Sequence, residues 1–123
     1  MSSRTHGILD YITVLVLLIS PTLLELQSSV ATFTYGLAFI HLILTFFTNF
    51  EAGVIKLVSF KIHGTIEIVV SIALIGIAIW FRISHDNVSF YFYLIFSVVL
   101  FVLWVATDYM PTFHKTIDKD LKT

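Results

Sequence analysis

The chain has 123 residues, of which 58% are hydrophobic and 12% are charged, and its mean hydropathy is +0.96. Soluble domains usually carry about 25% charged residues, so this composition excludes an ordinary soluble protein and makes a lipid bilayer the expected partner. The net charge of −1 and the lack of a basic patch interleaved with aromatics give no reason to expect nucleic acid. Cysteine is absent, which excludes disulfides, thiolate metal sites and thiol nucleophiles.

Four apolar segments are long enough to cross a bilayer, which takes about 20 helical residues. Their long runs without strict alternation predict helices, and the breaks between them carry turn residues. Pro21 is expected to kink the first helix near its far end. The chain is therefore predicted to be an all-α bundle of four transmembrane helices in one domain, residues 1–111, followed by a tail, residues 112–123. The predicted spans are Ile8–Leu26, Val30–Thr48, Ile62–Phe81 and Val88–Thr107.

The cationic residues predict the orientation of these spans. On the side opposite the chain ends, only Arg82 is cationic. The side with both chain ends and the middle loop carries six cations: Arg4, Lys56, Lys61, Lys115, Lys119 and Lys122. By the positive-inside rule, both termini are expected in the cytoplasm.

A seven-residue phrase occurs twice, at residues 4–10 and 61–67. Each copy places a base two residues before a His-Gly pair and a carboxylate four residues after the His, and the copies are 57 positions apart. A second similarity closes the second and fourth spans, in Thr48-Asn49-Phe50 and Thr107-Asp108-Tyr109. We therefore expect two tandem helical hairpins, residues 4–60 and 61–111, which point the same way around a pseudo-two-fold axis along the membrane normal.

The repeated ionisable residues are expected to meet in one cluster in the cytoplasmic leaflet. A spacing of four places His6 with Asp10, and His63 with Glu67, on one face of each helix. Charged groups inside a membrane are costly, so these side chains should face the bundle interior. Further polar residues are expected around them, at the same depth or at the cytoplasmic rim: Asn49, Asp108, Arg4 and Lys61.

Three interpretations of this cluster remain open. Carboxylates in a first helical turn are favoured by the helix dipole, which explains the residues by structure alone. Two imidazoles and two carboxylates, at His6, Asp10, His63 and Glu67, also form a donor set suited to Zn, Mn or Fe. Intramembrane Asp, Glu and His clusters are in addition typical of proton and ion pathways.

His41 is expected near the bilayer centre, about 12 Å from Asn49 along the second span. Its equivalent in the second repeat is Leu100, and no second histidine is expected at that depth. A haem held between two central histidines is therefore not expected. His41 is interpreted as a hydrogen-bonded interior residue rather than a ligand.

The first span resembles the SPW-repeat family of small bacterial integral membrane proteins. The similar residues are Asp10-Tyr11, the apolar run, and Ser20-Pro21 followed by Leu23 and Leu24. The chain departs from that pattern at Thr22, where the family has tryptophan, and the second repeat lacks the Ser-Pro pair. The resemblance implies tandem two-span units in a bacterial cytoplasmic membrane, and it implies no particular activity.

No phosphate-binding glycine loop, nucleophile elbow or His-Glu-x-x-His motif is present, so we do not expect an enzyme. The leading expectation is a non-enzymatic structural or accessory protein, as a homo-oligomer or within a larger membrane complex. No cofactor is expected, apart from a divalent metal considered at the cluster. The alternative expectation is a metal-binding or a proton- or ion-translocating protein that uses the cluster.

Overall fold

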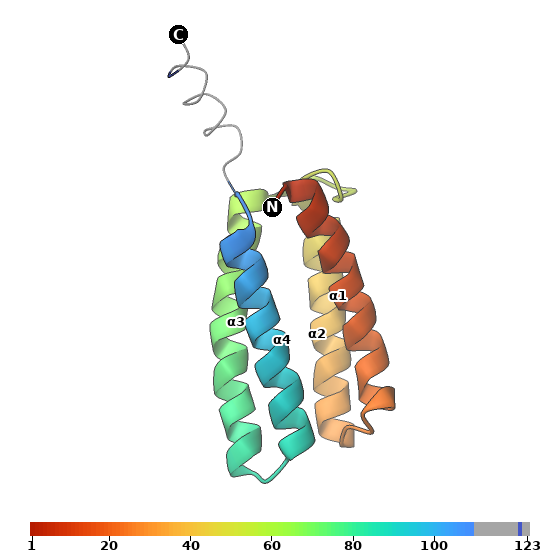
Figure 1. Cartoon of the computed structure of the whole chain (residues 1–123). Coiled ribbons are helices and arrows are strands. Elements are labelled where there is room, and N and C mark those ends of the chain that lie inside the picture. The colour runs from red at the N-terminus through yellow and green to blue at the C-terminus, as the bar shows by residue number, and fades with distance from the viewer. Residues whose placement is uncertain (110–120, 122–123) are drawn as a thin grey trace.

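The structure is a computed structural model that describes residues 1–109 and 121. It contains four long helices in chain order: α1 (Ser3–Leu23), α2 (Ser28–Phe46), α3 (Phe60–Ile83) and α4 (Asn87–Ala106) (Figure 1). All four are long and apolar enough to cross a membrane. The prediction of an all-α bundle with four membrane-spanning helices is confirmed. Apart from Leu121, the predicted tail at 112–123, with its three lysines, lies outside the described residues.

Serine side chains set where the two site-bearing helices begin. The hydroxyls of Ser2 and Ser59 each accept a hydrogen bond from the backbone N–H three residues later, both at 3.2 Å. Such caps satisfy amides that the first helical turn leaves free. As a result α1 begins five residues before its predicted start and α3 two residues before. His6 and His63 therefore lie inside regular helix, one turn from its start.

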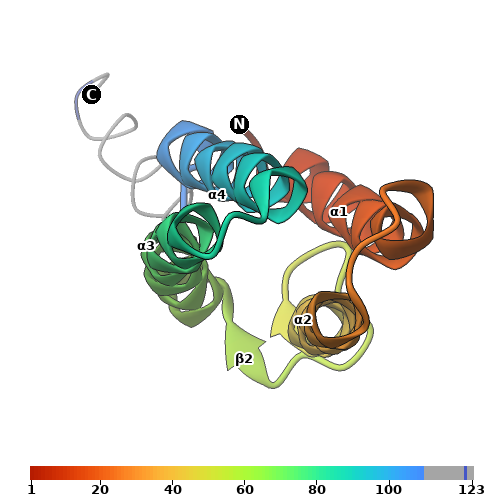
Figure 2. The same cartoon turned by 90° about the horizontal axis from the view of Figure 1, so that it is seen from below.

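The two hairpins are parallel copies. Helix α1 packs along α2, and α3 packs along α4, as the two views show (Figures 1 and 2). Helices α1 and α3 begin at the same end of the bundle, where α4 also ends (Figure 1). We call this end the site end and the opposite end the far end.

A short connection crosses the site end between α2 and α3. It contains two parallel two-residue strands, β1 (Thr48–Asn49) and β2 (Val58–Ser59), in which Thr48 pairs with Val58. Because α2 ends at Phe46 rather than at the predicted Thr48, the residues that follow adopt the alternation of a strand. In β1 the Thr48 side chain is buried and the Asn49 side chain is exposed.

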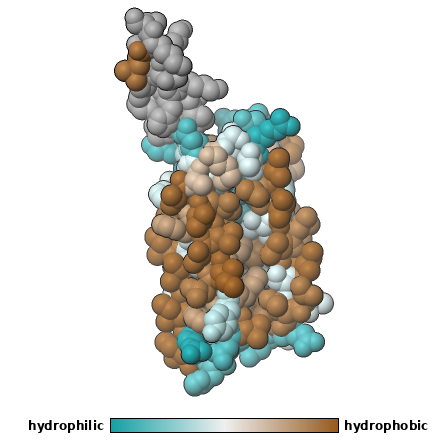
Figure 3. All heavy atoms as spheres, viewed as in Figure 1, coloured by the Kyte–Doolittle hydropathy of each residue, from teal (hydrophilic) through white to brown (hydrophobic). Residues whose placement is uncertain are grey.

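The interior of the bundle combines large apolar side chains with small buried hydroxyl residues, among them Thr34, Ser71 and Ser97. Leu17, Leu74 and Leu100 are almost completely buried there with Tyr93. The Tyr93 hydroxyl donates to Thr34 Oγ1 at 2.5 Å, which ties α4 to α2 across the two hairpins. On the outside of the bundle, large apolar side chains cover the face seen in Figure 3, and hydrophilic atoms lie at its two ends. This pattern is expected of a bundle whose sides face hydrocarbon.

Candidate metal centre

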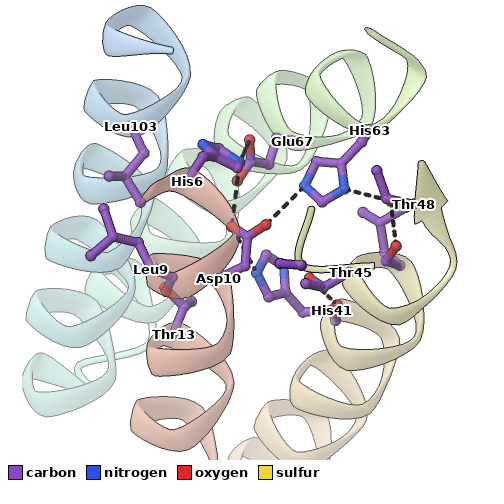
Figure 4. A network of polar contacts seen from close by, with 12 residues as sticks. His6, Leu9, Asp10, Thr13, His41, Thr45, Thr48, His63, Glu67 and Leu103 are labelled. Carbon is purple, nitrogen blue, oxygen red and sulfur yellow. Dashed lines mark hydrogen bonds and ion pairs between the residues drawn. The ribbon is translucent and has the colours of Figure 1, made fainter. Parts of the chain in front are cut away.

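The structure brings together the four residues named as a donor set. His6 and Asp10 come from α1, His63 and Glu67 from α3, and one ligand atom of each lies within 4.8 Å of the others. His6 Nε2 is 3.3 Å from Asp10 Oδ1 and 3.2 Å from Glu67 Oε2, and His63 Nε2 is 3.3 Å from Asp10 Oδ2 (Figure 4). All four residues are at most 2% exposed. The two repeated phrases thus form one buried site between the hairpins.

Two threonines fix the orientation of the two histidines. His6 Nδ1 lies 2.8 Å from Thr107 Oγ1, and His63 Nδ1 lies 2.8 Å from Thr48 Oγ1. Each threonine hydroxyl donates its own proton to a carbonyl four residues earlier, at 2.6 Å for Thr107 and 2.5 Å for Thr48. The threonine oxygens must then accept from the rings, so each Nδ1 carries a proton. A neutral imidazole in this tautomer directs the lone pair of Nε2 into the site.

Each of these histidines is bonded to a threonine of the other repeat. His6 of the first hairpin is held by Thr107 of the second, and His63 of the second hairpin by Thr48 of the first. This reciprocal arrangement is what a pseudo-two-fold axis between the hairpins requires.

The four further polar residues expected around the cluster or at its rim lie at the edge of the site end. Asn49 is exposed, because β1 turns it away from the bundle, and this corrects its expected place in the cluster. Asp108 is half-buried, and its backbone N–H donates to the Met1 carbonyl at 3.3 Å. Arg4 and Lys61 are exposed at the surface of the site end.

His41 belongs to this site, which corrects its expected isolation near the bilayer centre. Its Nε2 atom lies 3.6 Å from Asp10 Oδ1, and the residue is 8% exposed. Three imidazoles from the described part of the chain therefore surround Asp10 (Figure 4). A sequence signal exists, because Thr45 follows His41 by four residues, which places both on one face of α2, and both are buried.

Three aromatic rings cover the cluster at the site end. Phe50 and Phe60 stack at 5.3 Å between ring centroids, and Phe60 lies 4.7 Å from Tyr109. The glycine of each His-Gly pair makes room for one ring. A Cβ atom at Gly7 would come within 2.3 Å of Ala52 Cβ and 2.6 Å of the Phe50 ring, and one at Gly64 within 2.6 Å of the Tyr109 ring. The repeated glycines thus allow an aromatic cap, defined by Phe50, Phe60 and Tyr109, to close over the histidines.

Tyr109 also contacts the site directly. Its hydroxyl donates to Glu67 Oε2 at 2.8 Å. Burial raises the pKa of this hydroxyl well above its usual range, and the nearby Glu67 carboxylate raises it further. Tyr109 therefore remains a proton donor to Glu67 at any physiological pH.

The two buried carboxylates give the site negative charge that needs compensation. Asp10 and Glu67 together carry −2 when ionised, and the ion pairs of these two residues in the described part of the chain are with histidines. A buried ion costs several kcal/mol unless it is compensated. Among the residues that the structure describes, six buried side-chain atoms lack a hydrogen-bond partner, and all belong to this site: Nε2 of His6, His41 and His63, both Asp10 oxygens, and Glu67 Oε1. The site therefore requires about two positive charges, as protons or as a cation.

No family model, curated protein or solved structure matches this chain. The resemblance to the SPW-repeat family stays a prediction.

Proposed function

We propose that this chain is an integral membrane protein that binds one divalent transition metal ion between its two hairpins. His6, Asp10, His63 and Glu67 are the proposed ligands. The observation that carries the proposal is the orientation of the histidines, whose Nδ1–H groups are bound by Thr107 and Thr48 while both Nε2 atoms face carboxylate oxygens. Metal-ligating histidines are held in this way, with the second ring nitrogen donating to an outer-shell acceptor.

The distances favour a metal ion over protons. A protonated imidazole bound to a carboxylate has an N···O distance of about 2.7–2.9 Å. Here the three closest distances are 3.2–3.3 Å, and the atoms involved on the histidines and Asp10 make no hydrogen bonds. Ligands of a tetrahedral Zn²⁺ ion, at about 2.0–2.1 Å from the metal, lie about 3.3 Å from one another. These three distances therefore suit an ion of this size, and the wider separations in the set, up to 4.8 Å, must shorten when it binds.

The charge of the site supports the same assignment. One divalent cation neutralises both carboxylates, and neutral histidines add no further charge. Mixed imidazole and carboxylate donors suit Zn²⁺, Fe²⁺ and Mn²⁺. We further propose that the site lies in the cytoplasmic leaflet of a bacterial membrane, because Arg4, Lys56 and Lys61 are at the site end and Arg82 at the far end.

The proposal is tested by metal analysis of the purified protein, followed by titration of the metal-stripped protein with Zn²⁺ and Co²⁺. We expect one ion per chain, with the visible spectrum of tetrahedral Co²⁺. His63→Ala should abolish binding, whereas His85→Asn, at an exposed residue of the far end, should leave it unchanged. A chain that binds no ion, or binds equally well after His63→Ala, would refute the proposal.

A second pair of variants tests the outer shell. Thr48→Val removes the acceptor for His63 and should weaken binding about 10–100-fold. Thr48→Ser keeps the hydroxyl and should restore most of the affinity. Thr32→Val is the matched control, because the exposed Thr32 hydroxyl donates only to the Ser28 carbonyl of its own helix.

A proton-handling role is the second candidate, favoured by three imidazoles around one buried carboxylate. It predicts pH-driven ion flux in proteoliposomes that Glu67→Gln abolishes, in a protein that binds no Co²⁺. The expectation of a non-enzymatic accessory or structural protein, alone as a homo-oligomer or in a larger complex, stays a prediction. Metal binding itself requires no catalytic step.

A further inference from the structure

The connection between α2 and α3 exposes large apolar side chains outside the helical bundle. Val54, Ile55 and Leu57 are 64%, 44% and 75% exposed. Unlike the apolar side chains of the helices, they do not lie along a membrane-spanning segment. Apolar side chains gathered on an exposed loop mark a surface that contacts a membrane or another molecule.

Backbone hydrogen bonds hold this connection in place. The N–H groups of Val54 and Ile55 both donate to the Phe46 carbonyl, at 2.8 and 3.1 Å. The N–H groups of Leu57 and Val58 both donate to the Phe47 carbonyl, at 3.1 and 2.9 Å. The segment is thereby fastened to the end of α2. These backbone hydrogen bonds therefore hold its apolar side chains in an exposed position.

The same segment is fastened to α1. The Tyr11 hydroxyl donates to the Ala52 carbonyl at 2.8 Å, and Ser3 Oγ donates to Glu51 Oε2 at 2.6 Å. Figure 1 shows the connection beside the start of α1, at the site end. The loop thus lies level with the start of α1, at the site end of the bundle.

Two exposed cations accompany the apolar side chains. Lys56 lies between Ile55 and Leu57 in the chain, and Arg4 is on the first turn of α1. The hydrogen bond from Ser3 lowers the pKa of Glu51, and the charges of Lys56 and Arg4 lower it further. Because Ser3 is bonded to Glu51, the first turn of α1 that carries Arg4 lies against the loop that carries Lys56. Together the three groups carry a net positive charge.

We propose that residues 54–57 lie in the headgroup region of the membrane at the site end, where Lys56 and Arg4 bind the phosphate of an anionic phospholipid. Apolar side chains at this depth enter the boundary between headgroups and acyl chains. Long basic side chains reach from there to the phosphates. This lipid site does not depend on the proposed metal centre.

The absence of cysteine allows a direct test with one fluorescent label. Leu57→Cys, labelled with bimane, is reconstituted in phosphatidylcholine bilayers with a fixed fraction of brominated phosphatidylglycerol or brominated phosphatidylcholine. We expect stronger quenching by the anionic lipid. Lys56→Gln should reduce this preference about fivefold, the factor expected for one cation at an anionic surface. Arg82→Gln, at the far end, is the matched control and should not change it.

Other outcomes would overturn the proposal. Quenching by aqueous iodide, with none by either lipid, would place the loop in water. Protection from iodide and from both lipids would indicate that protein covers the loop. Equal quenching by the two lipids would leave an apolar anchor without an anionic site.

Discussion

At the level of single residues, the two halves of the site differ in what supports each carboxylate. Glu67 accepts a hydrogen bond from Tyr109, and the equivalent of Tyr109 in the first repeat is Phe50, which has no hydroxyl. Asp10 instead faces His41. The proposed ligands are thus arranged symmetrically, while the residues behind them are not.

Tyr109→Phe tests how much the Tyr109–Glu67 hydrogen bond, which the first repeat lacks, contributes to the free energy of unfolding. Bonds to charged groups contribute about 1.5–3 kcal/mol, so the variant should lose up to that amount of unfolding free energy at pH 7. The pKa of Tyr109 is raised in the folded protein, so its stabilisation is complete below the usual pKa of 10.0 and declines as pH rises above it. The difference between the two proteins should therefore shrink above pH 10.

Equilibrium unfolding in mixed micelles at pH 7, 9 and 11 measures this difference, since the other titrating groups are common to both chains. Tyr91→Phe is the control, because Tyr91 is 56% exposed. A difference that stays constant to pH 11 would contradict the assigned role of the hydroxyl.

At the level of helices, the sequence was sufficient to predict which repeated residues meet. A spacing of four fixes two side chains on one helix face wherever the helix begins. The depth of a residue, in contrast, depends on where the helix starts. Because α1 begins at Ser3, Asp10 lies about 10 Å inside it, which brings it level with His41.

The threonines could not be predicted in the same way. A helix face can be extrapolated only while the helix continues, and α2 ends at Phe46. Beyond it, the alternation of side chains along strand β1 turns Thr48 inward and Asn49 outward. The resemblance of Thr48-Asn49-Phe50 to Thr107-Asp108-Tyr109 located the correct segments, but it did not identify which residue of each enters the site.

Gly64→Ala tests whether the aromatic cap can pack against α3 only when a glycine occupies this position. The added Cβ atom would lie 2.6–2.8 Å from three atoms of the Tyr109 ring, so the ring must move away from Glu67. Crowding of this kind costs about 1–3 kcal/mol. In a Tyr109→Ala background the same substitution should cost much less.

Gly76→Ala is the matched control in the same helix. Nothing lies within 4 Å of a Cβ atom at Gly76, so alanine there should leave stability unchanged or raise it by about 0.5–1 kcal/mol. Unfolding in micelles measures both variants. Equal effects at the two positions would show that the cap does not require a glycine.

At the level of the whole molecule, contact between the hairpins is uneven along the bundle. An apolar furrow of about 750 Å³ runs between α1 and α4, from Leu9 and Leu103 near the site end to Leu23 and Val88 at the far end. Close polar contacts join the hairpins at the site, where each hairpin supplies one histidine and one carboxylate. A bound metal ion would therefore add a link at the site end to the contacts that already join the hairpins, among them the Tyr93–Thr34 hydrogen bond.

Without the ion, the carboxylates of Asp10 and Glu67 lie within 4.8 Å of each other on opposite sides of the hairpin boundary, and repulsion between them when both are ionised favours separation of α1 from α3. Spin labels at Arg4→Cys and Lys61→Cys, equivalent exposed positions on these helices, report this separation in a chain without other cysteines. We expect a narrow distance distribution with Zn²⁺ and a broader, longer one after chelation. A pair within one hairpin, Ile83→Cys with Val88→Cys, should not respond. If the first pair were equally unresponsive, the ion would not hold the hairpins together, even where metal analysis had found it bound.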